Sequence, residues 1–481
     1  MVFRRVFLIL ADGTRPDVFD RLISAGQLPN TARLFPDQSM RRTATTVFPS
    51  TTGPAFLPFL TGCFPGTTDM PGIRWFDRSA YVLRNGRPKQ RSYVGLESYR
   101  MNADLRPDIA TLFDIFPRST SMYSAINRGV HWSRNLTKVS RAALWVYAHE
   151  TDRWDTVHLR VRKRLLRALD TNPDFVFCVV PDADSLAHLS HPQSDPVLEA
   201  YGRLDETIGM LTSELERRGW RDESVVMVVS DHGQSAVHTH LGLPEWMRDE
   251  LGYDPFYYPR IWKRRFDSVV SISGNGMAHI DVRRGSTWGV ETATDEYLAK
   301  QHSHLMEALV QRPEVAVVAT RSERGMVIVR SKDGMARIDE TKDGKIDYSV
   351  LTSDPLGYDG IDGPMTADES LAATFDTKYP DGPVQLNQLF KSARTGDIVV
   401  SAEIGYDLRD KHERPEHKSG HGALHAEHML VPWFSSTPLP DAPLRTVDVY
   451  NAILSLTGRT SRSKIDGRPV VDVFREELIA T

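Results

Sequence analysis

The sequence predicts an α/β protein, an α/β/α sandwich with a mostly parallel central sheet. Three observations support this: short continuous apolar runs, helical patterns between them, and a long segment of different character that interrupts the alternation. The apolar runs "VFLILAD", "FVFCVVPDAD" and "SVVMVVSDHG" lead to Asp12, Asp184 and Asp231. Runs of this length are typical of strands buried on both faces of a parallel sheet.

Segments with helical spacing separate the predicted strands. Residues 195–220 carry apolar side chains at helical spacing and a glycine near the end, and "TVDVYNAILSLTG" predicts a closing helix. Alternating strands and helices favour a doubly wound sheet. In such sheets ligands bind beyond the carboxyl ends of the strands, so we expect Asp12, Asp184 and Asp231 to share one edge.

The interrupting segment predicts an inserted region. Residues 244–394 contain charged hairpin-like pieces and turn-rich stretches such as "SDPLGYDGIDGP", and they have fewer continuous apolar runs. We interpret them as an inserted α+β region that acts as a cap, with the core formed by 1–243 and 395–481. Within the second core segment, "DIVVSAEIGYD" at 397–407 predicts a buried strand that returns the chain to the core.

Composition limits the partners and the location. The 481 residues carry a net charge of -4, so we expect no nucleic-acid polymer as a partner. The chain has two cysteines, Cys63 and Cys178, shows no secretory signal, and has no apolar run near the roughly 18 residues of a membrane span. We therefore expect a cytoplasmic protein with core thiols. The sequence leaves the oligomeric state open.

A basic amphipathic helix is predicted at residues 158–169, "HLRVRKRLLRAL". A solvated helix face is the interpretation that we favour, because most such runs are solvated. Peripheral contact with anionic lipid headgroups is the alternative.

Aspartate and histidine residues cluster after the predicted strands. Asp231 and His232 are adjacent, and Asp184 and His188 stand four apart where the chain turns into a helix. A third segment, "HKSGHGALHAEHMLVP", holds His421 between two glycines. Each pair alone is more often a turn or a helix cap, but together with Asp12 they form a set of oxygen and nitrogen ligands that suits zinc. The same segment contains three further histidines, which we expect to be structural or to orient ligands: His417, His425 and His428.

The ordered set of Asp12, a threonine-bearing helix start, "PDADSLAH", "SDHG" and "SGHG" resembles the alkaline phosphatase superfamily, specifically its type I phosphodiesterase and nucleotide pyrophosphatase family. The resemblance covers most of the chain outside 244–394 and implies an alkaline-phosphatase-like core. It also implies two zinc ions, with manganese as an alternative metal. One ion would be held by Asp184, His188 and His421, and the other by Asp12, Asp231, His232 and the nucleophilic threonine.

The resemblance also implies which threonine is the nucleophile. In the family it stands nine residues before a Thr-Gly pair, and counting back from Thr61 selects Thr52 in "ATTVFPSTTGPAF". Thr51 is the second choice. An alignment on Phe-Pro would instead select Val47, which has no hydroxyl.

The substrate class stays open in the sequence. The family asparagine that contacts a phosphoryl oxygen is missing from "DMPGIRWFDR", where Arg74 is a candidate donor. The resemblance implies a phosphodiesterase or nucleotide pyrophosphatase that acts on a small-molecule phosphate ester through a metal-activated threonine and a covalent phospho-threonine. The alternatives are a phosphomonoesterase or phosphonate hydrolase of the same superfamily, and an inactive module that binds a phosphorylated ligand.

Overall fold

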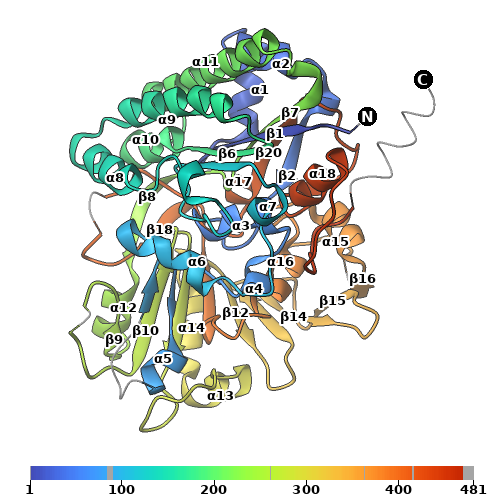
Figure 1. The fold of residues 1–481 in the computed structure, drawn as a ribbon. Helices are drawn as coiled ribbons and strands as arrows, with labels where there is room; N and C mark the ends of the chain where they lie inside the picture. The colour runs from blue at the N-terminus through green and yellow to red at the C-terminus, as the bar shows by residue number, and fades with distance from the viewer. Residues whose placement is uncertain (1, 84–89, 261, 362, 414–415, 470–481) are drawn as a thin grey trace.

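The computed structural model describes residues 2–83, 90–260, 262–361, 363–413 and 416–469. The chain begins in a seven-stranded sheet with the order β21-β2-β20-β7-β1-β6-β5 (Figure 1). Its strands are β1 (Arg5–Ala11), β2 (Arg41–Thr45), β5 (Ser119–Met122), β6 (Phe175–Val180), β7 (Ser224–Val229), β20 (Leu430–Ser435) and β21 (Leu444–Arg445). Only β20 runs antiparallel to its neighbours, which confirms a mostly parallel sheet.

The three predicted strands lie side by side in the middle of this sheet. β1 pairs with β6 on one side and with β7 on the other, parallel to both. Every residue of the three strands is buried. Continuous apolar sequence is needed here because helices cover both faces of the sheet.

Helices flank the sheet on both sides (Figure 1). One side holds α1 (Pro16–Ser24), α2 (Pro29–Leu34), α9 (Trp154–Ala168), α10 (Asp182–Ser190) and α11 (Asp195–Arg217). The other side holds α3 (Leu57–Thr61), α7 (Leu112–Ile115) and α18 (Asp448–Leu456), while α8 (Ser140–Thr151) packs on α9. α11 and α18 confirm the helices predicted at 195–220 and near the end of the chain. In the described ranges, no helix combines the length and apolar character that a membrane crossing requires.

A second, nine-stranded sheet has the order β16-β15-β14-β13-β12-β17-β11-β10-β9. Its strands are β9 (Pro255–Phe256), β10 (Ser268–Ser273), β11 (Met277–Val282), β12 (Val315–Arg321), β13 (Val327–Ser331), β14 (Gly334–Glu340), β15 (Ile346–Val350), β16 (Gly363–Met365) and β17 (Ile398–Ala402). The helices associated with this part of the chain are α12 (Leu243–Asp249), α13 (Asp295–Gln301), α14 (Ser303–Gln311), α15 (Ala367–Thr374) and α16 (Gly382–Leu389).

β17 differs from the prediction in the sheet that it joins. The strand is buried as expected, but it lies between β11 and β12 and pairs antiparallel with both, so it does not return the chain to the central sheet. A run that is apolar on both faces fits the interior of either sheet, and its own sequence does not choose between them. The boundaries proposed for the core and the inserted region stay a prediction.

Two smaller strand groups complete the fold. β8 (Ser235–Gly242) pairs with β18 (Gly405–Arg409) and β19 (Ser419–Gly420), and β3 (Arg74–Phe76) pairs with β4 (Gln90–Ser92). β8 leaves the end of β7, and β19 leads to His421. The pairing of β19 with β8 therefore brings the late histidine segment back to the carboxyl end of the central sheet.

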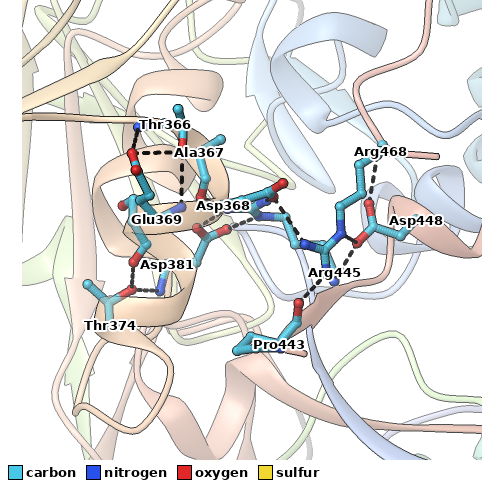
Figure 2. Close-up of polar contacts among 12 residues, drawn as sticks. Thr366, Ala367, Asp368, Glu369, Thr374, Asp381, Pro443, Arg445, Asp448 and Arg468 are labelled. Carbon is cyan, nitrogen blue, oxygen red and sulfur yellow. Dashed lines mark hydrogen bonds and ion pairs between the residues drawn. The ribbon is translucent and has the colours of Figure 1, made fainter. Parts of the chain in front are cut away.

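A buried ion-pair network joins the central sheet to the second part of the chain (Figure 2). Arg445 of β21 donates from Nε and Nη2 to the two carboxylate oxygens of Asp381, both at 2.7 Å. Asp381 is 0% exposed and directly precedes α16. Asp448 accepts the backbone N–H groups of Arg445 and Arg468 at 3.0 and 2.9 Å. The paired guanidinium and carboxylate satisfy one another where no water reaches them.

Replacing Asp381 with asparagine should destabilise the fold strongly. The Asp381→Asn substitution leaves the buried Arg445 guanidinium without its full counter-charge, a loss of about 3–5 kcal/mol in the free energy of unfolding. Urea denaturation measures it. Asp441→Asn is the control, because Asp441 pairs with Arg42 and is exposed to solvent. The unfolding midpoint of this variant should stay close to that of the wild type. Equal midpoints for both variants would contradict a stabilising role for the network.

Candidate metal centre

Three carboxylates meet at the carboxyl edge of the central sheet. Asp12 follows β1, Asp184 lies in the first turn of α10 directly after β6, and Asp231 follows β7. Because β6 and β7 flank β1, the three strand ends are neighbours. All three side chains are buried.

Gly13 permits this close approach. Its φ of +68° lies in the left-handed region, and a Cβ at this position would lie 2.8 Å from the Cβ and 2.9 Å from the Cα of Asp184. Any other residue would push α10 away from the end of β1 or strain the backbone. The glycine next to Asp12 therefore sets the spacing between two of the carboxylates.

The carboxylates and three histidines form two groups of potential metal ligands. Within each group, one ligand atom per residue lies within 4.8 Å of the others. The rings of His232 and His421 stack with centroids 3.7 Å apart, so the two groups adjoin. The first group is Asp184, His188 and His421, and the second is Asp12, Asp231 and His232.

Backbone carbonyls orient all three histidines. Nδ1 of His188 donates to the Ser419 carbonyl at 2.9 Å, and Nδ1 of His421 donates to the Ser50 carbonyl at 3.1 Å. Nδ1 of His232 donates to the Gly233 carbonyl at 3.1 Å. A carbonyl only accepts, so each Nδ1 carries a proton, and in the neutral imidazole each Nε2 then offers a lone pair. This is the arrangement that metal-binding histidines use.

The Nε2 atoms face the carboxylates. His188 Nε2 lies 3.4 Å from Asp184 Oδ1, and His232 Nε2 lies 3.2 Å from Asp231 Oδ2. His421 Nε2 lies 3.8 Å from Asp184 Oδ1. Lone pairs of imidazole and carboxylate therefore converge on the same small volumes.

The electrostatics of the cluster favour a bound cation. Burial, followed by the charges of Asp231 and Asp184, raises the pKa of Asp12 well above its ordinary value, and burial also raises the pKa of Asp231. Burial acts on Asp184 in the same direction, but the nearby histidines, His188 first, hold the pKa of Asp184 below its ordinary range.

Two further observations test whether these residues fit metal ions. Oδ2 of Asp231 is buried and has no hydrogen-bond partner within the described ranges. Across the same ranges, no lysine or arginine forms an ion pair with Asp12, Asp184 or Asp231. Buried carboxylates need a counter-charge, and mixed oxygen and nitrogen donors of this kind bind divalent cations. The residues therefore fit two divalent metal ions.

Of the two candidate threonines, Thr52 lies at the second group. Its Oγ1 is 3.0 Å from His232 Nε2 and 3.5 Å from Asp12 Oδ1, and the residue is half-buried. Thr51 is fully buried, and its Oγ1 lies against Gly274, where an added Cβ would come within 2.8 Å of it. The two neighbouring hydroxyls thus have different surroundings, and only that of Thr52 contacts the ligand cluster.

Two glutamines that the sequence analysis missed support the site. Nε2 of Gln234 donates to Asp184, and its Oε1 accepts from Ser419 Oγ at 2.9 Å. Gln385 of α16 accepts the Phe48 N–H at 2.9 Å and donates to Asp381 at 2.8 Å. Gln234 follows Asp-His-Gly directly, a position that could have marked it. Gln385 has no such signal, because only the fold brings α16 to the threonine segment.

The remaining predicted residues lie outside the two groups. Arg74 of β3 places its guanidinium over the Tyr258 ring at 5.5 Å, and no hydrogen bond or ion pair joins it to either group in the described structure. The His417 ring lies 4.3 Å from that of His188. His425 caps α17 (Ala426–Met429), and Nε2 of His428 contacts Ser235 Oγ at 2.8 Å.

Fold and site together define a metal-dependent hydrolase on a large mixed α/β scaffold. The family model "Type I phosphodiesterase / nucleotide pyrophosphatase" matches residues 6–424, and the chain belongs to this family of phosphoester hydrolases. The expected family is thereby confirmed, and this family indicates a phosphoester hydrolase.

Solved structures with the same fold have low sequence identity to the chain. Phosphonoacetate hydrolase from Sinorhizobium meliloti 1021, in complex with phosphonoformate, is 16% identical with a TM-score of 0.58, over 95% of this chain and 96% of that one. Human ectonucleotide pyrophosphatase/phosphodiesterase 5 is 14% identical with a TM-score of 0.59, over 96% and 97%. An inactive threonine-to-alanine variant of the murine protein, in complex with AMP, is 13% identical with a TM-score of 0.54, over 97% of each chain. No curated protein sequence matches the chain significantly.

The chain should bind two divalent ions, and Asp231→Asn should lower the binding stoichiometry to one. The substitution removes a charged ligand from the second group and leaves the first group intact. Calorimetric titration of the metal-free protein with Zn²⁺ or Mn²⁺ measures both numbers. Asp170→Asn is the control, because Asp170 pairs with Arg218 at the surface. Retention of two equivalents in Asp231→Asn would exclude Asp231 as a ligand.

Stabilisation by the metal should increase with pH. Because their folded-state pKa values are raised, Asp12 and Asp231 hold protons in the metal-free fold at pH values where the unfolded chain has lost them. The metal-free fold therefore loses stability as pH rises through that window, and a cation displaces the protons more easily at the higher pH. Melting temperatures with and without saturating Zn²⁺ at about pH 5 and about pH 8 test this. An equal shift at both pH values would contradict it.

Proposed function

We propose that the chain hydrolyses small-molecule phosphodiesters, with Thr52 as the nucleophile. The observation that carries this proposal is the half-buried Thr52 hydroxyl, 3.0 Å from His232 and beside Asp12. An alcohol needs activation at neutral pH before it can act as a nucleophile. The position of the Thr52 hydroxyl at the ligand cluster supports activation by a metal. Two Zn²⁺ ions, held by Asp184, His188 and His421 and by Asp12, Asp231 and His232, would make the hydroxyl more acidic and neutralise charge on the phosphoryl group.

The chain's own groups would then carry out a double displacement. Thr52 Oγ attacks phosphorus and forms an O–P bond while the P–O bond to the leaving alcohol breaks, and the proton of the Thr52 hydroxyl ends on that alcohol. The phospho-threonine keeps the second ester group. Water next attacks the phospho-threonine, which restores the Thr52 hydroxyl and releases a phosphate monoester. Gln385 holds the start of this segment through the Phe48 N–H, and Gln234 orients Asp184.

The surroundings of Arg74 support a diester rather than a monoester. A phosphate monoester carries an extra negative charge, which enzymes usually meet with additional arginine or lysine donors. Here Arg74 lies over Tyr258, and its charge opposes the rise in pKa that burial causes in Asp410 and Glu413. Arg74 therefore lies near Tyr258, Asp410 and Glu413 and not at the ligand groups.

The choice of zinc and the cytoplasmic location are part of this proposal. Mixed carboxylate and imidazole donors suit Zn²⁺, and Mn²⁺ is the alternative. Cys63 and Cys178 are both buried free thiols, as expected for core residues. A nucleotide diester is the first natural substrate class to test, because the murine relative was solved with AMP.

Turnover of three model substrates tests the proposal. The metal-loaded protein should hydrolyse a bis-aryl phosphate diester faster than the matching aryl monoester or phosphonoacetate. Thr52→Ala should lower diester turnover by at least about a thousandfold, since it removes the nucleophile. Mass spectrometry after acid quenching should detect the aryl phosphoryl group on the wild-type peptide that contains Thr52.

Thr51→Ala is the matched control, because Thr51 is the adjacent threonine and is fully buried. It should keep diester turnover within about tenfold of the wild type. Loss of activity in Thr51→Ala alone would transfer the role to Thr51. Faster cleavage of the monoester or of phosphonoacetate would instead assign a phosphomonoesterase or a phosphonate hydrolase.

A further inference from the structure

Several strongly exposed apolar side chains lie on α8 and next to it. Val139, directly before the helix, is 88% exposed, and Val146 is 52% exposed. Ala143 and Tyr147 are exposed as well. Positions 139, 143, 146 and 147 have the spacing of one helical face, so the four side chains form a continuous stripe.

The opposite face of α8 is already used by the fold. Leu144 and Ala148 are buried on that side. A helix with apolar residues on both faces is normally enclosed by protein, whereas α8 leaves one apolar face in solvent. Exposed apolar patches on a globular protein mark interaction sites.

Neighbouring elements enlarge this surface. The 3₁₀ helix η3 (Gly95–Arg100) lies beside α8, where Arg141 donates to Ser98 Oγ at 2.8 Å, and Leu96 of η3 is 73% exposed. On the other side, Arg164 of α9 donates to Ser140 Oγ at 2.6 Å. We call this region the α8 surface, formed by Leu96, Lys138, Val139, Ala143, Val146, Tyr147 and Arg160.

Cations accompany the apolar side chains. Lys138 precedes Val139, and Arg160 lies one helical turn before Arg164, which contacts the start of α8; both Lys138 and Arg160 are exposed. Neither forms an ion pair with any residue that the structure describes, whereas Arg162 on the same helix pairs with Glu206 at 2.9 Å. Glu150, one helical turn after Val146, is exposed on the same face, whereas Glu97 beside Leu96 is paired with Arg100 at 3.5 Å. Two cations and one acid, none of them in an ion pair within the described residues, leave this surface net positive on a chain that is net negative at -4. It is complementary to a negatively charged partner.

We propose that the α8 surface docks the protein on a lipid bilayer that contains anionic headgroups. Exposed aliphatic and tyrosine side chains enter the headgroup boundary, while lysine and arginine remain at the level of the phosphates. α9 packs against α8 and also against α10, the helix that carries Asp184 and His188. The docking face is therefore built on the same helix layer that supports the metal ligands.

Vesicle co-sedimentation tests the proposal independently of catalysis. The full-length protein should pellet with vesicles of phosphatidylcholine mixed with phosphatidylserine, and much less with phosphatidylcholine alone. Lys138→Glu and Arg160→Glu should each weaken the partition coefficient by at least about fivefold, and added salt should weaken it further. The double variant Val139→Glu/Val146→Glu should abolish pelleting.

Val290→Glu is the matched control, because Val290 is 56% exposed and lies outside the α8 surface. It should pellet like the wild type. If the double variant melts at a lower temperature than the wild type, the two charge variants decide, since their side chains are solvent-exposed. Pelleting with neither vesicle type, or pelleting unchanged in the charge variants, would overturn the proposal. A concentration-dependent dimer in sedimentation velocity without vesicle binding would overturn it by assigning the surface to a second copy of the chain.

Discussion

Three buried carboxylates at one sheet edge are the constraint on which the rest of the site depends. Asp12, Asp184 and Asp231 follow adjacent strands, and their burial places negative charges where water does not screen them. No arginine or lysine in the described parts of the chain pairs with them, and one oxygen of Asp231 has no hydrogen-bond partner there. Such an arrangement is stable only with cations or protons. The buried carboxylates repel one another, and a bound cation removes this repulsion, so their burial increases the affinity for metal.

The histidines and the threonine segment are held by groups from distant parts of the chain. Each imidazole donates a hydrogen bond from Nδ1 to a backbone carbonyl, and the three Nε2 atoms therefore face the carboxylates. Gln385 accepts the Phe48 N–H and donates to Asp381. Asp381 is in turn the partner of the buried Arg445 (Figure 2). The threonine segment is thus connected to the ion-pair network that joins the two parts of the fold. Ligand orientation and global stability share these contacts.

The α8 surface shows how one helix layer can serve two roles. α9 packs against α10, which carries the candidate ligands Asp184 and His188, and it also packs against α8, which has the exposed apolar face. The sequence favoured a solvated face for the basic helix, and in the described structure one of its cations, Arg162, pairs with Glu206 of α11. The sequence did not predict the exposed apolar stripe of α8. A helix that is apolar on both faces has the pattern of a buried helix.

The sequence alone predicted the central strands, the order of the motifs that follow them and the candidate ligands. Continuous apolar runs are local, and ligand residues directly follow them, so strand ends and motifs could be recognised without the fold. Tertiary structure decided what local patterns do not encode. It assigned β17 to the second sheet, separated Thr52 from Thr51 by their contacts, and brought Ser50, Ser419 and Gln385 to the site. These outcomes depend on contacts between residues up to hundreds of positions apart, and a local sequence pattern does not specify which distant residue it will contact.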